Sequence, residues 1–332
     1  MRVGPSLLLM LGLFACRNDN EVIRQVGSDL FYQVPTDQVD ILWVTDNSCS
    51  MADEQAAIGA KFESFIGSIV DSNIDFHIGV ITTDLVAADQ AGKLQAPADE
   101  PLYLDANVPD YAGRFRERIS VGTQGSDREA GIDAAFQALS QPLVSGFNEG
   151  FRRPEATLSI IYLSDENDCT DRGGLSEFED GKACYEHGDQ LTPVKALIDD
   201  YKDLAEGEAR LLVSSIVGPE ISEGCDGAKP GPRYSAMAEA FGGVQGNICA
   251  QDFSAIMTEL GLQVSGTLTN FQLSQPAVKD SIAVWVDEVA VPEDPDNGWT
   301  YDEAYAILYF HGAGVPPRGS AILVEYEIAG PG

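Results

Sequence analysis

The fold is decided by residues 39–50, which read VDILWVTDNSCS. Four consecutive apolar residues between polar neighbours predict a short strand buried on both faces, as strands are in parallel sheets. Apolar residues then recur at helical spacing over 58–69, so the intervening loop joins a strand to a helix. Asp46, Ser48 and Ser50 are therefore expected at the carboxyl end of a central strand, where open α/β sheets place their ligand sites.

The chain repeats this alternation up to about residue 262, with apolar runs separated by segments of helical periodicity. The predicted strands are 76–82, 158–163 and 211–217, and the predicted helices are 126–139, 194–204, 234–241 and 252–260. Residues 86–120 show little periodicity and indicate an elaborated surface loop. The expected fold class over 38–262 is α/β, a doubly wound, mostly parallel sheet with helices on both faces.

From residue 263 onward apolar and polar residues alternate, which is the period of a half-buried strand. Pro- and Gly-rich turn sequences separate the alternating stretches. These features predict a small antiparallel β module over 263–332. Its aromatic residues Trp285, Trp299 and Tyr301 either form a stacking surface for a sugar or peptide, or fill the core of the module.

A second aspartate, Asp165, follows a later apolar strand in the way that Asp46 follows the first one. Because neighbouring parallel strands end at the same edge of a sheet, both carboxylates are expected to point to one place. Ser126 begins a predicted helix and, with Glu129, has the spacing of a helix cap, and Ser50 with Asp53 has the same spacing. Carboxylate and hydroxyl oxygens suit a hard divalent cation, Mg²⁺ above all.

Residues 46–50, Asp-Asn-Ser-Cys-Ser, resemble the Asp-x-Ser-x-Ser loop of von Willebrand factor A (vWA) domains, which forms their metal-ion-dependent adhesion site. The order of predicted strands and helices over 38–262 is similar to that family too. The resemblance implies a Rossmann-like fold and a divalent cation, Mg²⁺ or alternatively Mn²⁺ or Ca²⁺, that binds a carboxylate of a protein partner. The implied metal ligands are Asp46, Ser48, Ser50, Ser126 and Asp165, with Thr123 as the alternative to Ser126.

Residues 1–16 have the pattern of an export signal, with a basic residue before an apolar run over 7–15 that is too short to span a bilayer. The run ends in Leu-Phe-Ala-Cys, which resembles the lipobox of bacterial lipoproteins, so Cys16 is the expected lipidation site. The alternative is an ordinary cleaved signal. The arginine after Cys16 implies, by resemblance to lipoprotein sorting, the outer membrane. Residues 17–37 are predicted to be a polar tether, and membrane contact is expected through the lipid alone.

An exported chain meets an oxidising compartment, where cysteines pair. Five cysteines follow the lipobox, an odd number, so at least one is expected to stay free or to pair elsewhere. We favour the bonds Cys169–Cys184 and Cys225–Cys249, each of which closes a loop of about 15–25 residues. A bond between Cys49 and Cys169 is the alternative. Zinc is not expected, because the sequence has no Cys-x-x-Cys and no pair of histidines at ligand spacing.

The net charge of −33, from 53 acidic and 20 basic residues, argues against nucleic-acid binding. The expected function is that of a cell-envelope lipoprotein that binds a divalent cation and, through it, an acidic group of a protein partner. The alternative is a structural envelope module whose metal site is vestigial or purely stabilising. A metal-assisted hydrolase built on Asp46, Asp165 and His77 is disfavoured, because the chain has no Gly-x-Ser-x-Gly elbow, phosphate loop or His-Glu-x-x-His. The chain is therefore not expected to be an enzyme.

Overall fold

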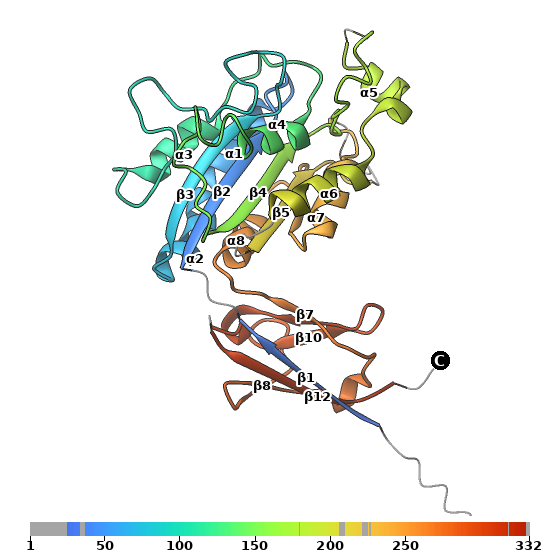
Figure 1. Ribbon diagram of the computed structural model, residues 1–332. Helices are drawn as coiled ribbons and strands as arrows, with labels where there is room; N and C mark the ends of the chain where they lie inside the picture. Colours follow the sequence, from blue (N-terminus) through green and yellow to red (C-terminus); the bar gives the residue numbers. More distant parts are fainter. Residues whose placement is uncertain are drawn as a thin grey trace, which may run out of the picture.

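The computed structural model describes residues 25–33, 37–178, 180–205, 210–220, 225, 227–317 and 319–329. These residues form a larger body built on a parallel sheet and a smaller body of antiparallel strands, which lies below it in Figure 1. The export signal predicted over 1–16, with Cys16, lies outside the described residues. No helix within the described ranges combines the length and the apolar character needed to cross a membrane.

The larger body contains a parallel sheet with the strand order β3-β2-β4-β5-β6. The strands are β2 (Gln38–Thr45), β3 (Asp75–Thr82), β4 (Thr157–Ser164), β5 (Arg210–Val217) and β6 (Gln245–Asn247). The central strands β2 and β4 are buried along nearly their whole length, which explains why their sequences are apolar runs rather than alternating patterns. The register places Thr45, the last residue of β2, opposite Thr82 of β3 and Leu163 of β4. The carboxyl ends of these three strands therefore meet at one edge.

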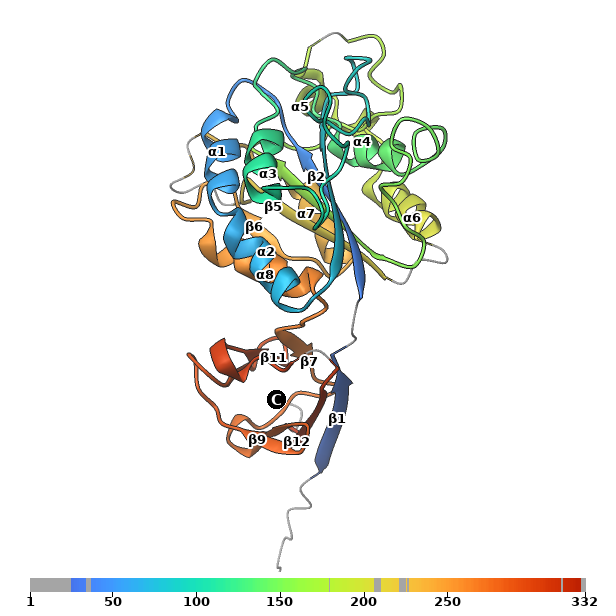
Figure 2. The same ribbon diagram turned by 90° about the vertical axis from the view of Figure 1, so that its left-hand side faces the viewer.

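Helices cover both faces of this sheet, as Figure 2 shows in a view turned by 90° about the vertical axis. One face carries α1 (Ala52–Ala60), α2 (Phe62–Asp71), α3 (Tyr111–Ile119) and α8 (Ser254–Val264). The other face carries α4 (Gly131–Ala138), α6 (Val194–Leu204) and α7 (Pro232–Ala240). A short helix α5 (Ala183–Glu186) and the 3₁₀ turn η1 (Gly188–Gln190) lie in the connection between β4 and α6.

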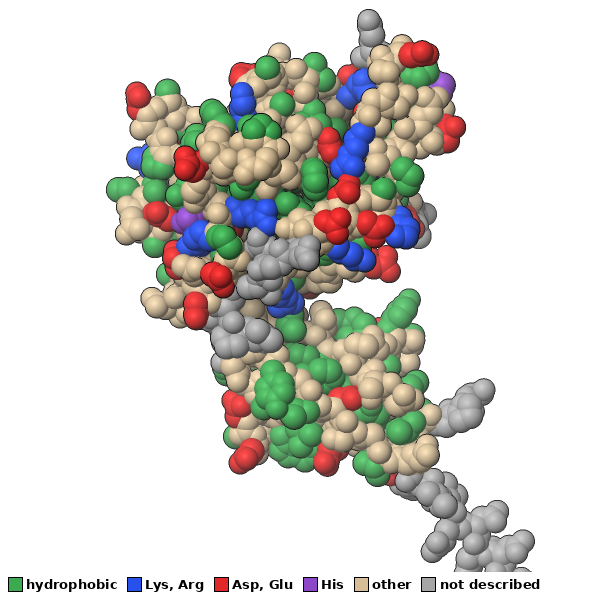
Figure 3. Space-filling model, in the orientation of Figure 1, with side chains coloured by type: hydrophobic (Ala, Val, Ile, Leu, Met, Phe, Trp, Pro, Cys, Tyr) green, Lys and Arg blue, Asp and Glu red, His purple; other side chains and the backbone are tan. Residues whose placement is uncertain are grey.

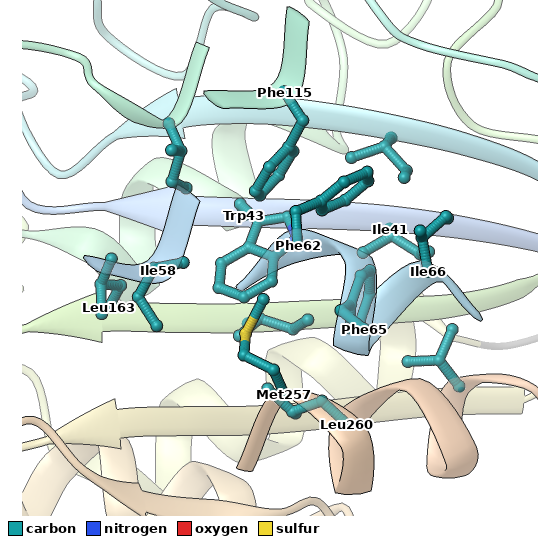
Figure 4. Close-up of a cluster of buried hydrophobic side chains, with 14 of the residues drawn as sticks. Ile41, Trp43, Ile58, Phe62, Phe65, Ile66, Phe115, Leu163, Met257 and Leu260 are labelled. Carbon is teal, nitrogen blue, oxygen red and sulfur yellow. The ribbon is translucent and has the colours of Figure 1, made fainter. Parts of the chain in front are cut away.

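Trp43 of β2 lies at the centre of the first of these two cores (Figure 4). Its ring meets Phe65 of α2 and Phe115 of α3 edge-on, with centroid distances of 5.6 and 5.5 Å. Met257 and Leu260 of α8 complete the cluster. These aromatic pairs fix the position of β2, because edge-to-face rings prefer one geometry and each buries a large apolar area. The loop after β2 thus starts from a rigid strand.

The smaller body is made of two antiparallel sheets with the strand orders β1-β12-β8-β9 and β10-β11-β7. The strands are β1 (Val26–Tyr32), β7 (Asn270–Gln272), β8 (Ala283–Val286), β9 (Val289–Val291), β10 (Trp299–Asp302), β11 (Ile307–Phe310) and β12 (Ala321–Glu327), with the 3₁₀ turns η2 (Lys279–Ser281) and η3 (Gly312–Gly314). β1 pairs with β12 along its whole length, from Val26 opposite Glu327 to Tyr32 opposite Ala321. Both ends of the described chain therefore belong to one small body.

The expected fold class, a doubly wound mostly parallel sheet followed by a small antiparallel module, is wrong as a description of this chain. The described residues form three sheets, one parallel and two antiparallel. The smaller body also begins before the parallel sheet, since residues 26–32 of the predicted tether form β1. The rest of that tether, 17–24 and 34–36, lies outside the described residues. Residues 26–32 form a strand because β12 supplies their hydrogen-bond partners.

Several local expectations also change. The helix predicted from Ser126 begins at Gly131, and the loop predicted over 86–120 contains α3. In the smaller body, Trp299 and Tyr301 are buried, so they fill the core. Trp285 is only half-buried, on the outer side of its sheet.

Candidate functional site

The β2–α1 loop is held by Asp46, which lies directly after β2 and is completely buried. Its backbone N–H donates to Leu163 O at 2.9 Å, so the ends of β2 and β4 are joined. Its Oδ1 accepts from the Ser48 backbone N–H at 2.7 Å, and its Oδ2 accepts from the Ser164 hydroxyl at 2.6 Å. The carboxylate therefore has one orientation, which is set by the loop on one side and by β4 on the other.

Ser48, Ser50 and Asp165 gather beside this carboxylate. The Ser48 and Ser50 hydroxyl oxygens are 3.3 Å apart, and the Ser50 hydroxyl lowers the pKa of the Asp165 carboxyl against the effect of its burial. Gln55 of α1 fastens the loop from below, because its side-chain amide donates to Asp46 O at 2.8 Å and to Gly122 O at 2.9 Å. The structure thus brings together four of the five predicted ligands. They come from two loops, and Asp46 and Asp165 are 119 residues apart in the sequence.

Ser126, the fifth predicted ligand, lies at the rim of this group. Its backbone N–H donates to the Asp84 carboxylate at 3.1 Å, and its hydroxyl accepts from the Arg128 backbone N–H at 3.1 Å. Within the described residues it makes no hydrogen bond to Asp46 or Asp165. The preceding Gly125 packs so closely on Asn47 that a Cβ at position 125 would collide with the Asn47 side chain. This contact sets the distance between the first and second loops.

The helix-cap interpretation of Ser126 and Ser50 is wrong. α4 begins at Gly131 with Ala130 as its first flanking residue, and α1 begins after Met51 without a side-chain cap. Glu129, which the sequence presents as the capping partner of Ser126, instead points inward and is 2% exposed. It is the functional candidate that the sequence analysis missed. The sequence shows only an acidic residue at this position. What turns the segment along the buried edge of the sheet is the hydrogen bond from the Ala130 N–H to Thr83 O, at 3.0 Å.

Buried oxygens without partners mark this edge of the sheet. They are Thr45 Oγ1, Asn47 Oδ1, Thr83 Oγ1, Glu129 Oε1 and Asp165 Oδ1, none of which has a hydrogen-bond partner among the described residues. Buried polar atoms in folded proteins nearly always find a partner, because desolvation without one is costly. Each of these atoms can accept, and several cannot donate. Among the described residues, these oxygens therefore have no donor or cation that satisfies them.

The carboxyl groups of Asp46, Glu129 and Asp165 all have raised pKa values, which agrees with the lack of partners for these oxygens. Burial raises the pKa of Asp46 to about 6 and outweighs the hydrogen bonds from Ser164 and Ser48, while the Asp165 charge raises it further. Burial, together with the charges of Asp46 and Glu166, raises the pKa of Glu129 to about 9. Burial also raises the pKa of Asp165, against the hydrogen bond from Ser50. Each charge disfavours the others, so the group favours binding of protons or of a cation.

The residues present fit a hard divalent cation in their chemistry. The hydroxyls of Ser48 and Ser50 and the carboxylates of Asp46 and Asp165 are the oxygen ligands that Mg²⁺, Mn²⁺ and Ca²⁺ accept. The part of the chain that the structure describes contains no group of three or more His, Cys, Asp or Glu side chains arranged as metal ligands. A cation here would thus be held by hydroxyls and two carboxylates, with water or a partner completing its shell. The five predicted ligands and the metal remain predictions.

The rim above this edge is built from the connection that follows β4. Glu166 accepts from the Tyr185 hydroxyl and from Lys229 Nζ, both at 2.8 Å. Lys229 Nζ also lies 4.3 Å from the centre of the Tyr185 ring. Below them, Asp168 is fully buried and accepts from Arg233 Nε at 3.0 Å. Lys229 is the cation of this rim, and its side chain is half-exposed.

The disulfide predictions Cys169–Cys184 and Cys225–Cys249 are confirmed. The alternative pairing of Cys49 is wrong, since Cys49 is free and exposed. The first bond joins two points of the β4–α6 connection, one shortly after Glu166 and one next to Tyr185, and so holds together the rim beside the candidate site.

Of the three residues of the disfavoured hydrolase, His77 does not join Asp46 and Asp165. His77 Nδ1 lies 2.9 Å from Phe151 O and 3.6 Å from Asp40 Oδ1, near the start of β2. Asp46 lies at the other end of that strand, six residues further on, which is roughly 20 Å at the usual rise of a strand. His77 is therefore a structural residue of the opposite edge.

No protein-family model matches this chain, and no curated protein matches its sequence. Several solved structures are similar. One is the pilus adhesin SpaC from Lactobacillus rhamnosus GG in an open conformation, with 10% identity over 91% of this chain and 41% of that chain and a TM-score of 0.41. Another is the pilus adhesin RrgA from Streptococcus pneumoniae, with 9% identity, 91% and 58% coverage and a TM-score of 0.34. A third is the PilB minor pilin from Streptococcus sanguinis, with 10% identity, 70% and 62% coverage and a TM-score of 0.43.

This chain spans less than two thirds of the length of each of those chains, and a likeness at such TM-scores carries no argument about function. The predicted membership of the vWA family is wrong by these findings. No family model supports it, and the similar structures are described as pilus adhesins and a minor pilin. What the candidate site can do must follow from its own residues.

Proposed function

We propose that this chain binds a divalent cation at the carboxyl edge of its parallel sheet and, through that cation, an acidic group of a protein partner. One observation carries the proposal: buried oxygens without hydrogen-bond partners surround carboxyl groups whose pKa values their burial and mutual repulsion raise. A cation would satisfy the oxygens and relieve the repulsion in one step.

The ligand set explains why a partner would take part. Asp46, Ser48, Ser50 and Asp165 supply two carboxylates at most, and Glu129 with its raised pKa is neutral at pH 7. A cation held by so few protein charges keeps a strong attraction for a further anionic oxygen. Ser50 is exposed and Lys229 is half-exposed, so a partner's carboxylate could reach this edge from the solvent.

The net negative charge of the chain makes the binding of an acidic partner depend more strongly on the cation. At −33 the chain repels an acidic partner at long range, and a bound cation would oppose that repulsion locally. Binding is therefore expected to require the cation, and moderate salt is expected to favour it by screening the repulsion.

The proposal assigns the chain to an exported, binding role without catalysis. Its support for export is the pair of disulfide bonds, which form and persist in oxidising compartments. Anchoring through a lipid on Cys16 is part of the proposal and rests on the sequence pattern alone.

The test is a calorimetric titration of Mg²⁺, Mn²⁺ and Ca²⁺ into residues 17–332, beside Asp46→Asn and beside Asp84→Asn as the matched control. Asp84 is a buried carboxylate of the neighbouring loop that is engaged with backbone N–H groups. We expect saturable binding that Asp46→Asn abolishes and that a folded Asp84→Asn variant retains. Equal binding by the wild type and Asp46→Asn would refute the site.

The partner role has its own measurement. Water-proton relaxation of the Mn²⁺-loaded protein reports water bound to the metal, and acetate or an aspartyl peptide should lower it by displacing that water. A saturable decrease supports the proposal. A cation that binds and raises the melting temperature, yet keeps its water against both probes, would identify a purely stabilising site instead.

A further inference from the structure

The outer side of the β1-β12-β8-β9 sheet carries a continuous row of apolar side chains. Leu30 of β1 is paired with Leu323 of β12, Leu323 with Trp285 of β8, and Trp285 with Ala290 of β9. Directly paired residues lie on the same side of a sheet, so these four side chains form one row across all four strands. Their neighbours along each strand, such as Phe31 and Ile322, point to the core instead.

This row, which we call the Leu30–Trp285 row, faces solvent. Leu30 is 54% exposed, and Trp285 is half-buried, whereas Trp43 and Trp299 are buried. Figure 3 shows hydrophobic side chains gathered on the front of the lower body, with acidic side chains at their margin. Leu30, Leu323 and Trp285 of this row line a shallow hollow of about 660 Å³, together with Ala321, Asp287, Glu288 and Glu325.

The rim of the hollow is acidic, and no basic side chain of the described residues pairs with it. Glu288 and Glu325 form no ion pair within the described residues. Asp287 accepts hydrogen bonds from the Ser320 hydroxyl and the Ala321 N–H, which lower its pKa and keep it ionised. Lys279 is engaged elsewhere, with Glu293. The hollow is thus an apolar floor beside uncompensated carboxylates.

We infer that this hollow docks a basic segment of a protein partner, whose Lys or Arg stems lie on the Leu30–Trp285 row while their charged ends meet Glu288 and Glu325. Long basic side chains have an apolar stem and a cationic end, which matches this floor and rim. The half-exposed Trp285 ring adds an attractive surface for the cation.

Charge argues against other occupants. A second copy of this chain would bring the same acidic rim and a net charge of −33 against an equal charge. An anionic membrane surface would be repelled in the same way. The surface lies in the smaller body, and it prefers a basic partner where the proposed cation site prefers an acidic group. The inference therefore goes beyond the proposed function and stands or falls separately.

The experiment uses the full chain and two labelled peptides, acetyl-Lys-Leu-Lys-Leu-Lys-Leu-Lys-amide and its counterpart with Glu in place of Lys. Peptide anisotropy gives the dissociation constant, and the tryptophan emission reports the hollow, because Trp285 is the half-exposed tryptophan. EDTA is present throughout, so that the cation site plays no part. We expect the Lys peptide to bind and the Glu peptide not to bind. The affinity for the Lys peptide should decrease as the NaCl concentration is raised.

Two variants with equal charge changes localise the effect. Glu288→Gln/Glu325→Gln removes the rim charges, and Asp280→Asn/Glu303→Gln removes two exposed charges elsewhere on the same body. We expect the first to weaken binding about tenfold and the second to leave it within about twofold. Leu30→Gln, on an exposed edge-strand position, should also weaken binding with no change of charge.

Each other outcome overturns the inference. Equal weakening by both charge variants would mean attraction to net charge alone, and equal binding of both peptides would indicate a ligand recognised without charge. Absence of binding at millimolar peptide would remove the docking role. Concentration-dependent dimers that Leu30→Gln abolishes would assign the row to a second copy.

Discussion

Replacement of Asp46 by asparagine is expected to stabilise the protein when no divalent cation is present. The buried carboxylate has a pKa of about 6 instead of the ordinary 3.8. Each pKa unit corresponds to about 1.4 kcal/mol, so the ionised side chain destabilises the folded state by about 3 kcal/mol at most. Asparagine has the same shape without the charge. Its oxygen can still accept from the Ser48 N–H, and its amide can donate to the Ser164 hydroxyl.

The pH dependence gives the sign of the effect. Because the pKa of Asp46 is higher in the folded state, the folded protein holds that proton more tightly than the unfolded chain does. The contribution of Asp46 to wild-type stability should therefore fall as the pH rises from about 4 to about 6, and stay at its lower level above that range. The advantage of Asp46→Asn should be absent near pH 4 and reach about 1 to 3 kcal/mol at pH 7.5.

Urea denaturation in EDTA, followed by ellipticity at 222 nm, measures this difference in the larger body, which contains all the α-helices of the described residues. Repeating it with Mg²⁺ at about 100 times its dissociation constant should raise wild-type stability by about 2.7 kcal/mol and leave Asp46→Asn unchanged. A variant less stable than the wild type in EDTA at pH 7.5 would refute the reasoning about burial. A variant that keeps the cation-dependent gain would refute the assignment of Asp46 as a ligand.

Three further predictions concern packing, disulfides and a buried ion pair. Gly261→Ala should lower the free energy of unfolding by about 1 to 3 kcal/mol, because a Cβ on α8 would collide with the backbone of Phe65 in α2. Gly67→Ala, which has open space, should raise it by up to about 1 kcal/mol, and equal melting shifts would contradict the packing argument. Cys225→Ser/Cys249→Ser should cost about 3 kcal/mol in urea under non-reducing conditions, from a loop of 24 residues, and an unchanged midpoint would exclude a stabilising bond. Arg233→Met should cost about 3 to 5 kcal/mol because it leaves Asp168 buried without its cation, and Arg233→Met/Asp168→Asn should recover much of that loss in the same assay.

The sequence was most informative where a local pattern and the final environment agree. The apolar runs before Asp46 and Asp165 became central strands, and Asp46, Ser48, Ser50 and Asp165 came together because parallel strands end at one edge. The two disulfides were also predictable, since each closes a short loop in the sequence. These features depend on neighbouring residues and on general rules of sheet geometry.

It failed where the environment is supplied by distant residues. Ser126 and Glu129 have the spacing of a helix cap, yet hydrogen bonds from Ala130 to Thr83 and from Cys169 to Glu129 hold this segment along the sheet edge and turn Glu129 inward. The strand Val26–Tyr32 contains Gly, Ser and Asp, and it resembles a polar tether until β12, nearly 300 residues later, pairs with it. The prediction of family membership failed because a five-residue motif and an alternating order of strands and helices, which many α/β proteins share, do not specify a family.

The pairing of β1 with β12 has a mechanical consequence. β1 belongs to the smaller body and β2 to the larger one, and they are consecutive strands of the chain (Figure 1). If the protein is held at a point before β1, as the predicted lipid on Cys16 would hold it, a pull at the end of β2 stretches this covalent path. The other strands of the smaller body and the helices of the larger one lie outside this segment of the chain, so they would bear little of the tension. A load on the candidate site would then pass to the anchor along two extended strands, and domain unfolding would not be needed to transmit it.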